Sequence, residues 1–176
     1  MRQSTAVIVA TLLLGAVNAR AQSAVAAKID PTWVRVVAAT KTAEFQLVAG
    51  LSAANGGMNF NGFDKGGLTL TVPLGWNVVI HFKNEDQNLP HSVEIISDTT
   101  ALPLGPVRPA FEKASTGKLE QGFSAGQGND FRFLAAKDGS FLIFCAVPGH
   151  GAAGMWIRLA VSATADKPTL AATAVR

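Results

Sequence analysis

The most informative segment of the chain is Phe141–Val161, which reads FLIFCAVPGHGAAGMWIRLAV. In an extended chain Phe141, Ile143 and Cys145 share one face, and from Met155 to Val161 the apolar residues Met155, Ile157, Leu159 and Val161 recur with a period of two. This alternation is typical of half-buried β-strands. The residues between the two runs are rich in Gly and contain Pro148, which favours a loop. The segment therefore predicts two neighbouring strands joined by a short loop.

Three side chains with metal-binding atoms border this loop at a regular spacing. Cys145, His150 and Met155 follow the pattern C-x4-H-x4-M. Thiolate, imidazole and thioether form a soft set of donors, which suits copper that cycles between Cu(I) and Cu(II). Hard cations such as Mg²⁺ and Ca²⁺ prefer oxygen ligands and are disfavoured. The spacing thus indicates one copper ion per chain, and core packing is the alternative role for Met155.

A trigonal copper site of this kind needs a second histidine, and His91 in the segment Leu89-Pro-His-Ser92 supplies it. It lies in a polar loop between two strand patterns, so it can meet the Cys145 loop at one end of a β-sandwich. We expect His91, Cys145 and His150 to form a plane around the metal, with Met155 as a weak axial ligand. Backbone N–H groups near the Cys145 sulfur, including that of Ser92, would tune the site. Asn84 is a candidate for hydrogen bonds within the same loops.

Further alternating runs are separated by turn residues along the rest of the chain. No long segment has helical periodicity, so we expect an all-β sandwich or barrel of about eight strands, with its domain at residues 40–162. Asn59–Phe63 is interpreted as a short strand and Lys137–Ser140 as a hairpin turn. Residues 163–176 are polar and Ala-rich, which predicts a flexible tail. The clearest additional runs begin at Phe45, Leu68, Val78, Val93 and Phe131.

These motifs together resemble the cupredoxins, the small blue copper proteins. Within them the chain is most similar to the sulfocyanins, with the rusticyanins as near relatives in the ligand loop. The resemblance covers about Glu44 to Val161. It implies a Greek-key β-sandwich of eight strands and one-electron transfer without substrate turnover. The residues that carry it are Asn59-Phe-Asn-Gly-Phe63, Thr71-Val-Pro-Leu-Gly-Trp76, Pro90-His-Ser92 and Cys145–Trp156.

The N-terminal residues 1–21 are predicted to be a cleaved signal peptide. An apolar run of twelve residues, Ala6–Val17, precedes an A-x-A sequence at Ala19–Ala21. The run is shorter than the about 20 residues that span a bilayer, so we expect no stable membrane insertion after cleavage. The resemblance to sulfocyanins implies a membrane tether at the N-terminus. This sequence departs from that pattern, because its apolar run is short and is followed by a cleavage site. A periplasmic or secreted protein is predicted, with residues 22–39 as a leader or edge strand.

The net charge argues against nucleic acid as a partner. The full chain carries 15 − 12 = +3, and removal of Arg2 and Arg20 leaves 13 − 12 = +1. A nucleic-acid-binding domain usually has a strongly basic stripe, and none is visible. We expect a monomer whose partners are redox proteins such as a terminal oxidase or a cytochrome, docking around His150. The surface predicted for this docking comprises Leu89, Pro90, Val147, Pro148, Gly149, Gly151, Ala152 and Ala153.

Two other function classes compete with that of an electron carrier. A copper-binding protein for metal delivery or buffering would use the same donors in a more open site. An enzyme is not expected, because a multicopper oxidase or nitrite reductase needs further copper ligands and the chain has only three His. The third, His81, lies on the polar phase of a strand and is interpreted as a surface residue. Gly122-Phe-Ser-Ala-Gly126 matches the G-x-S-x-G elbow of hydrolases, but no helix pattern follows it.

Overall fold

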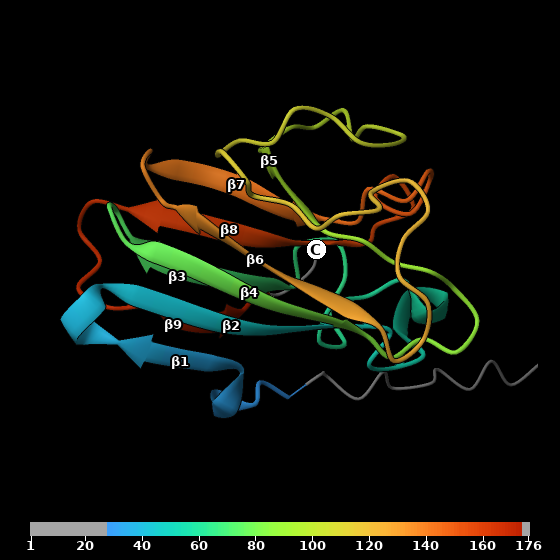
Figure 1. Ribbon diagram of the computed structural model, residues 1–176, viewed down its shortest axis with the longest axis horizontal. Helices are drawn as coiled ribbons and strands as arrows, with labels where there is room; N and C mark the ends of the chain where they lie inside the picture. The colour runs from blue at the N-terminus through green and yellow to red at the C-terminus, as the bar shows by residue number, and fades with distance from the viewer. Residues whose placement is uncertain (1–27, 174–176) are drawn as a thin grey trace, which may run out of the picture.

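This computed structural model describes residues 28–173, which contain nine strands arranged in two sheets (Figure 1). The first sheet has the order β1-β2-β4-β6, and the second has the order β5-β7-β8-β3-β9. The predicted signal peptide lies outside the described residues. The strands are β1 (Val34–Val37), β2 (Thr42–Ala49), β3 (Leu68–Pro73), β4 (Asn77–Asn84), β5 (Glu94–Ser97), β6 (Gly128–Leu134), β7 (Gly139–Phe144), β8 (Trp156–Ser162) and β9 (Thr169–Ala172).

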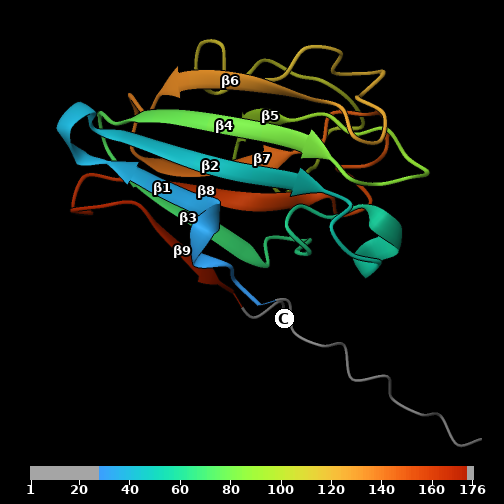
Figure 2. The same cartoon turned by 60° about the horizontal axis from the view of Figure 1, so that its bottom comes forward.

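The connections between strands make this arrangement a sandwich. Every connection from β2 to β7 crosses from one sheet to the other, and Figure 2 shows β6, β4, β2 and β1 as one layer in front of the second sheet. The pairs β2–β4 and β3–β8 are parallel, and the remaining pairs are antiparallel. The all-β sandwich expected from the sequence is confirmed. Only three short 3-10 helices occur in residues 28–173: η1 (Pro31–Trp33), η2 (Ala38–Thr40) and η3 (Ala54–Gly57).

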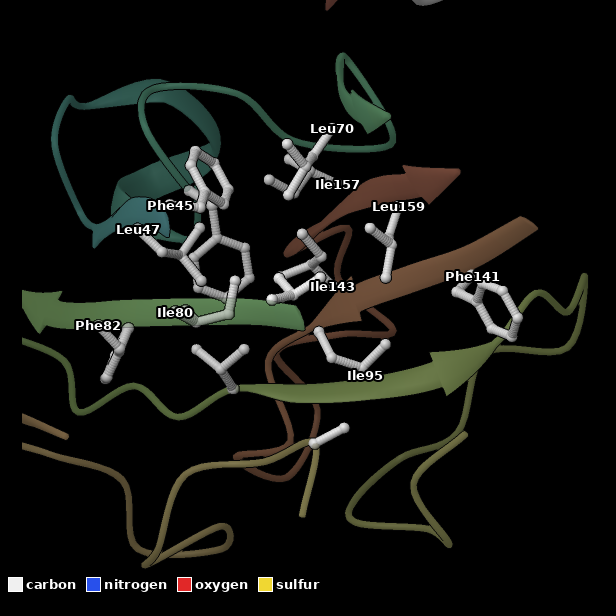
Figure 3. Close-up of a cluster of buried hydrophobic side chains, with 14 of the residues drawn as sticks. Phe45, Leu47, Leu70, Ile80, Phe82, Ile95, Phe141, Ile143, Ile157 and Leu159 are labelled. Carbon is white, nitrogen blue, oxygen red and sulfur yellow. The ribbon is translucent and has the colours of Figure 1, made fainter. Parts of the chain in front are cut away.

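The core lies between the sheets and follows from the period of two in the strands. Along β2, the alternate residues Ala43, Phe45, Leu47 and Ala49 are fully buried. Figure 3 shows their neighbours on β4 directed toward side chains from β5, β7 and β8. Burial of apolar surface on both inner faces is the main stabilising term for such a sandwich. No helix in residues 28–173 has both the length and the hydropathy to cross a bilayer.

Asn59–Phe63 forms a turn, so the predicted short strand is wrong. Phe60 and Phe63 exchange backbone hydrogen bonds of 2.9 and 2.8 Å, and Asn61 and Gly62 have positive φ angles of 53° and 80°. The Asn61 amide accepts the N–H of Val48 and donates to the carbonyl of Gln46. It therefore replaces a neighbouring strand for this part of β2. Both phenylalanines are buried in the core, as the sequence predicted.

Two further elements differ from the sequence prediction. Lys137–Ser140 reverses the chain, but its flanking strands β6 and β7 belong to different sheets and do not form a hairpin. The tail predicted to be flexible contains β9, which pairs antiparallel with β3 and packs the half-buried Leu170 against the core. The tail has weak apolar alternation because β9 is an exposed edge strand, so the sequence pattern does not predict it.

Candidate metal centre

The candidate metal ligands come from two connections at the same end of the sandwich, on the right in Figure 1. Cys145 directly follows β7, and Met155 directly precedes β8. The N–H of Cys145 donates to the carbonyl of Met155 at 3.0 Å, and the N–H of Met155 donates to the carbonyl of His150 at 3.0 Å. The loop is thus closed on itself, as two adjacent antiparallel strands allow.

His91 reaches this loop from the β4–β5 connection. Its backbone N–H and carbonyl both pair with Phe123, at 3.1 and 2.8 Å. The close approach requires a residue without Cβ beside Phe123, because a Cβ on Gly122 would lie 2.8 Å from the His91 nitrogen. A segment remote in the sequence therefore fixes the backbone of His91.

Three of the four predicted ligands converge with their metal-binding atoms facing one another. The Cys145 Sγ lies 3.9 Å from His91 Nδ1 and 3.7 Å from His150 Nδ1, and the two Nδ1 atoms are 3.2 Å apart. These atoms form the one group of three or more His, Cys, Asp or Glu ligands with metal-binding spacing among residues 28–173. His91 and Cys145 are fully buried, and His150 is half-buried. The convergence predicted from the sequence is confirmed for these three residues.

Met155 is fully buried as part of the core. Its backbone hydrogen bonds tie it to both Cys145 and His150, as described above. Packing and a weak axial contact are compatible, because the axial thioether in such sites is long and weakly bound. The ligand role of Met155 therefore remains a prediction.

Burial dominates the electrostatics of the three converging side chains. It raises the pKa of the Cys145 thiol to about 11, although the N–H groups of Ser92 and Val147 favour the thiolate and oppose this rise. Burial also lowers the pKa of His91 and of His150 below that of an exposed imidazole. Burial thus favours the neutral form of both imidazoles, which is the form that binds a metal.

Comparison with known proteins identifies the family. Residues 31–171 match the sulfocyanin (SoxE) domain. The chain belongs to the sulfocyanin family. A curated relative, the sulfocyanin of Sulfolobus acidocaldarius, is 28% identical over 140 residues, covering 73% of this chain and 67% of the relative.

Similar solved structures include copper proteins. Auracyanin A, a "blue" copper protein from Chloroflexus aurantiacus, has 20% identity and a TM-score of 0.49, covering 69% of this chain and 99% of its own. Rusticyanin from Thiobacillus ferrooxidans has 20% identity and a TM-score of 0.45, covering 74% and 86%. The sulfocyanins are electron-transfer proteins of the cupredoxin class, whose members bind a single type 1 copper.

The donor set of this sulfocyanin domain fits such a copper ion. A buried thiol and two neutral imidazoles converge, and a thioether precedes β8 directly after them. These are the ligand types of a His₂Cys site with an axial Met. A buried environment also limits access of water and small oxidants to the thiolate.

Asp86 is a buried partner of His91 that the sequence analysis missed. Its Oδ2 lies 3.2 Å from His91 Nε2, and Oδ1 accepts the N–H groups of Asn88 and Leu89 at 2.8 and 3.2 Å. Burial alone would raise the pKa of Asp86, but the N–H of Asn88, the His91 ring and the N–H of Leu89 outweigh it, and the pKa lies below its usual value. An acidic residue in a polar loop gives no sequence signal for this contact.

Asn84 takes the predicted part in the hydrogen bonding of these loops. Its amide nitrogen donates to the carbonyls of Leu89 and Phe123 at 2.9 and 2.7 Å, and its Oδ1 accepts the N–H of Asp86 at 2.9 Å. Asn84 is fully buried and ends β4. One side chain therefore joins the loop before His91 to the Phe123 segment that pairs with His91.

The positions of His81 and of the G-x-S-x-G match at Gly122–Gly126 agree with the interpretations made from the sequence. His81 is a surface residue, as predicted, and its Nδ1 lies 2.7 Å from Asp130 Oδ2 on the outer face of the first sheet. The G-x-S-x-G match lies in a turn before β6, with no strand before it and no helix after it. Ser124 is exposed there, and its N–H donates to the Gln127 side chain at 3.3 Å. The motif lacks the strand–turn–helix context of a hydrolase elbow.

Proposed function

We propose that this protein is an extracytoplasmic one-electron carrier, in which His91, Cys145, His150 and Met155 hold a single type 1 copper. The observation that carries the proposal is the buried convergence of the Cys145 sulfur with the Nδ1 atoms of two histidines. A copper ion bound there would accept and release one electron by cycling between Cu(II) and Cu(I). Service to a respiratory chain fits a carrier outside the cytoplasm, and the predicted signal peptide supports that location.

The protein residues contribute a rigid and partly dry environment. Backbone hydrogen bonds fix Cys145, His150 and Met155 on one closed loop, and the Phe123 segment fixes His91. A site held by such bonds changes little when its charge changes, and this lowers the reorganisation that electron transfer requires. The buried side chains of His91, Cys145 and Met155 leave the half-buried His150 as the route to solvent.

Exposed apolar residues around His150 support docking of a redox protein there. Pro148, Ala152 and Ala153 are exposed, whereas Val147 and Gly151, which the sequence also placed there, are buried. Leu104, which the sequence analysis did not include, is 72% exposed, and its carbonyl accepts the N–H of Gly149 at 2.8 Å. A partner such as a terminal oxidase or a cytochrome is therefore proposed to contact this surface transiently.

The first experiment is the visible spectrum of the purified protein with Cu(II), beside a Cys145→Ala control. We expect an intense thiolate-to-copper charge-transfer band that a reductant bleaches and an oxidant restores. The control is expected to lack this band, because the alanine removes the sulfur ligand.

The alternative function, copper delivery or buffering, would give a different result. Copper binding with only weak d–d absorption would exclude the thiolate as a ligand and favour copper delivery or buffering. Rapid transfer of the copper to a chelator, with the band present, would also argue against a closed electron-transfer site.

A further inference from the structure

The two ring nitrogens of His91 face different surroundings. Nδ1 faces the Cys145 sulfur and His150, whereas Nε2 faces Asp86 Oδ2 at 3.2 Å. A carboxylate can only accept a hydrogen bond, so Nε2 must carry the proton in this contact. The neutral ring then leaves the lone pair on Nδ1, directed toward the other ligands.

The Asp86 carboxylate is itself held in place by hydrogen bonds. Its other oxygen accepts the N–H groups of Asn88 and Leu89, and its own N–H donates to Asn84. The side chain is 7% exposed, and that of His91 is 0% exposed. Two backbone N–H groups donate to this carboxyl group, an arrangement that favours its ionised form.

The backbone of another part of the chain packs closely against Asp86. A Cβ on Gly57 would lie 2.3 Å from Asp86 Oδ2, and one on Gly50 would lie 2.4 Å from the Asp86 Cβ. Both glycines have positive φ angles, 91° and 66°, which other residues rarely adopt. The loop between β2 and β3 therefore closes over the carboxylate with two residues that have no side chain.

We propose that Asp86 is a positioning residue that fixes the tautomer and orientation of His91 and places a negative charge beside the metal centre. The proposal rests on the copper site proposed above. Ligand histidines in metalloproteins commonly donate their second N–H to such a partner, and loss of that partner weakens metal binding about 10- to 100-fold. A nearby negative charge also stabilises Cu(II) relative to Cu(I) and lowers the reduction potential.

The first test needs no copper and no variant. Imidazole ¹⁵N chemical shifts of the metal-free protein report which ring nitrogen of His91 carries the proton. We expect a single tautomer with the proton on Nε2. A proton on Nδ1, or a mixture of the two tautomers, would overturn the proposal, whatever the protein does with copper.

Two substitutions then separate the hydrogen bond from the charge. Asp86→Asn keeps an oxygen that can accept the Nε2–H but removes the charge, so the charge-transfer band should persist and the reduction potential should rise. Asp86→Ala removes both, so a mixture of tautomers and a 10- to 100-fold loss of copper affinity are expected. If Asp86→Ala does not fold, Asp86→Asn and the tautomer measurement still decide the question.

The matched control is Asp130→Asn. Asp130 makes the same type of contact with His81, at 2.7 Å, but its side chain is 64% exposed on the outer face of the first sheet. Water screens this charge, so the copper affinity and reduction potential should remain those of the native protein. Equal changes in both Asn variants would overturn the role of Asp86. Absence of the charge-transfer band in the native protein would instead reject the copper site, while the tautomer result would stand.

Discussion

Glu94 is a buried carboxyl group at the start of β5. Its side chain is fully buried, Oε2 accepts the N–H of Val107 at 3.0 Å, and Oε1 has no hydrogen-bond partner among the described residues. Burial raises the pKa of Glu94 above its ordinary value of 4.5, and the Val107 contact only partly opposes this rise. The folded protein therefore favours the protonated carboxyl group.

Replacement of Glu94 by Gln should make the metal-free protein more stable at neutral pH but not in acid. Between the unfolded and the folded pKa, the native state binds more protons, so the free energy of unfolding of the natural protein falls as the pH rises. The glutamine variant has no proton to release. Urea unfolding between about pH 4 and about pH 8 should show a difference that grows with pH. A difference that is constant over this range would contradict the argument.

The sequence predicts the ligands better than it predicts their surroundings. Cys145, His150 and Met155 lie close together in the chain, and their residue types limit the chemistry severely. Asp86 and Gly122 contribute through contacts with His91 that depend on the folded loops. Neither an acidic residue nor a glycine in a loop distinguishes such a contact from an ordinary turn.

The unit formed by β7, the ligand loop and β8 is packed closely at one particular point. The ring of Phe144, at the end of β7, is fully buried and lies against Gly151. A Cβ on Gly151 would come within 1.8 Å of the ring. The loop can therefore approach the strand only with a glycine at this position.

Gly151→Ala should lower the free energy of unfolding by about 1–3 kcal/mol, because the Phe144 ring must move out of a packed cluster. Gly105→Ala is the control, since a Cβ there would meet no atom within 4 Å. Denaturant unfolding of both metal-free variants measures the difference. A Gly151 variant as stable as the Gly105 variant would show that the loop can move away from the ring without loss.

At the level of elements, strong alternation of apolar residues predicted the strands of the core correctly. Weak or irregular patterns gave wrong predictions. The runs containing Phe45, Leu70 and Ile80 became β2, β3 and β4 because each buries one face. Asn59–Phe63 has aromatic residues but no alternation that extends beyond the turn, and β9 has little apolar surface to reveal it. A turn signal such as Lys137–Ser140 specifies a reversal of the chain, but not whether the flanking strands pair.

For the molecule as a whole, the two ends of the sandwich differ in character. One end carries the half-buried His150 and the exposed Leu104, which is joined to the ligand loop through Gly149. Leu134 is also exposed, but it pairs with Asn77 at the first residue of β4, whereas the loops around His91 follow its last residue, Asn84. Leu134 therefore lies at the opposite end.

Leu104→Lys should slow electron self-exchange between two copies of the copper protein. If both copies meet through the surface around His150, the two lysines repel each other, and the rate should fall roughly tenfold at low ionic strength. Added salt should restore much of the rate. NMR line broadening in mixtures of the oxidised and reduced protein measures it. Leu134→Lys adds the same charge at the other end, and an equal effect of both variants would place the contact elsewhere.

The single half-buried imidazole also constrains the kinetics of the proposed carrier. His91, Cys145 and Met155 are fully buried, so we expect an electron donor and an electron acceptor to use the same surface around His150 and to exclude each other while bound. The protein must then dissociate from one partner before it can bind the next, so it acts as a diffusing carrier and not within a permanent complex. Electron flow should therefore pass through a maximum as either partner is added, because an excess of one occupies the surface that the other also uses.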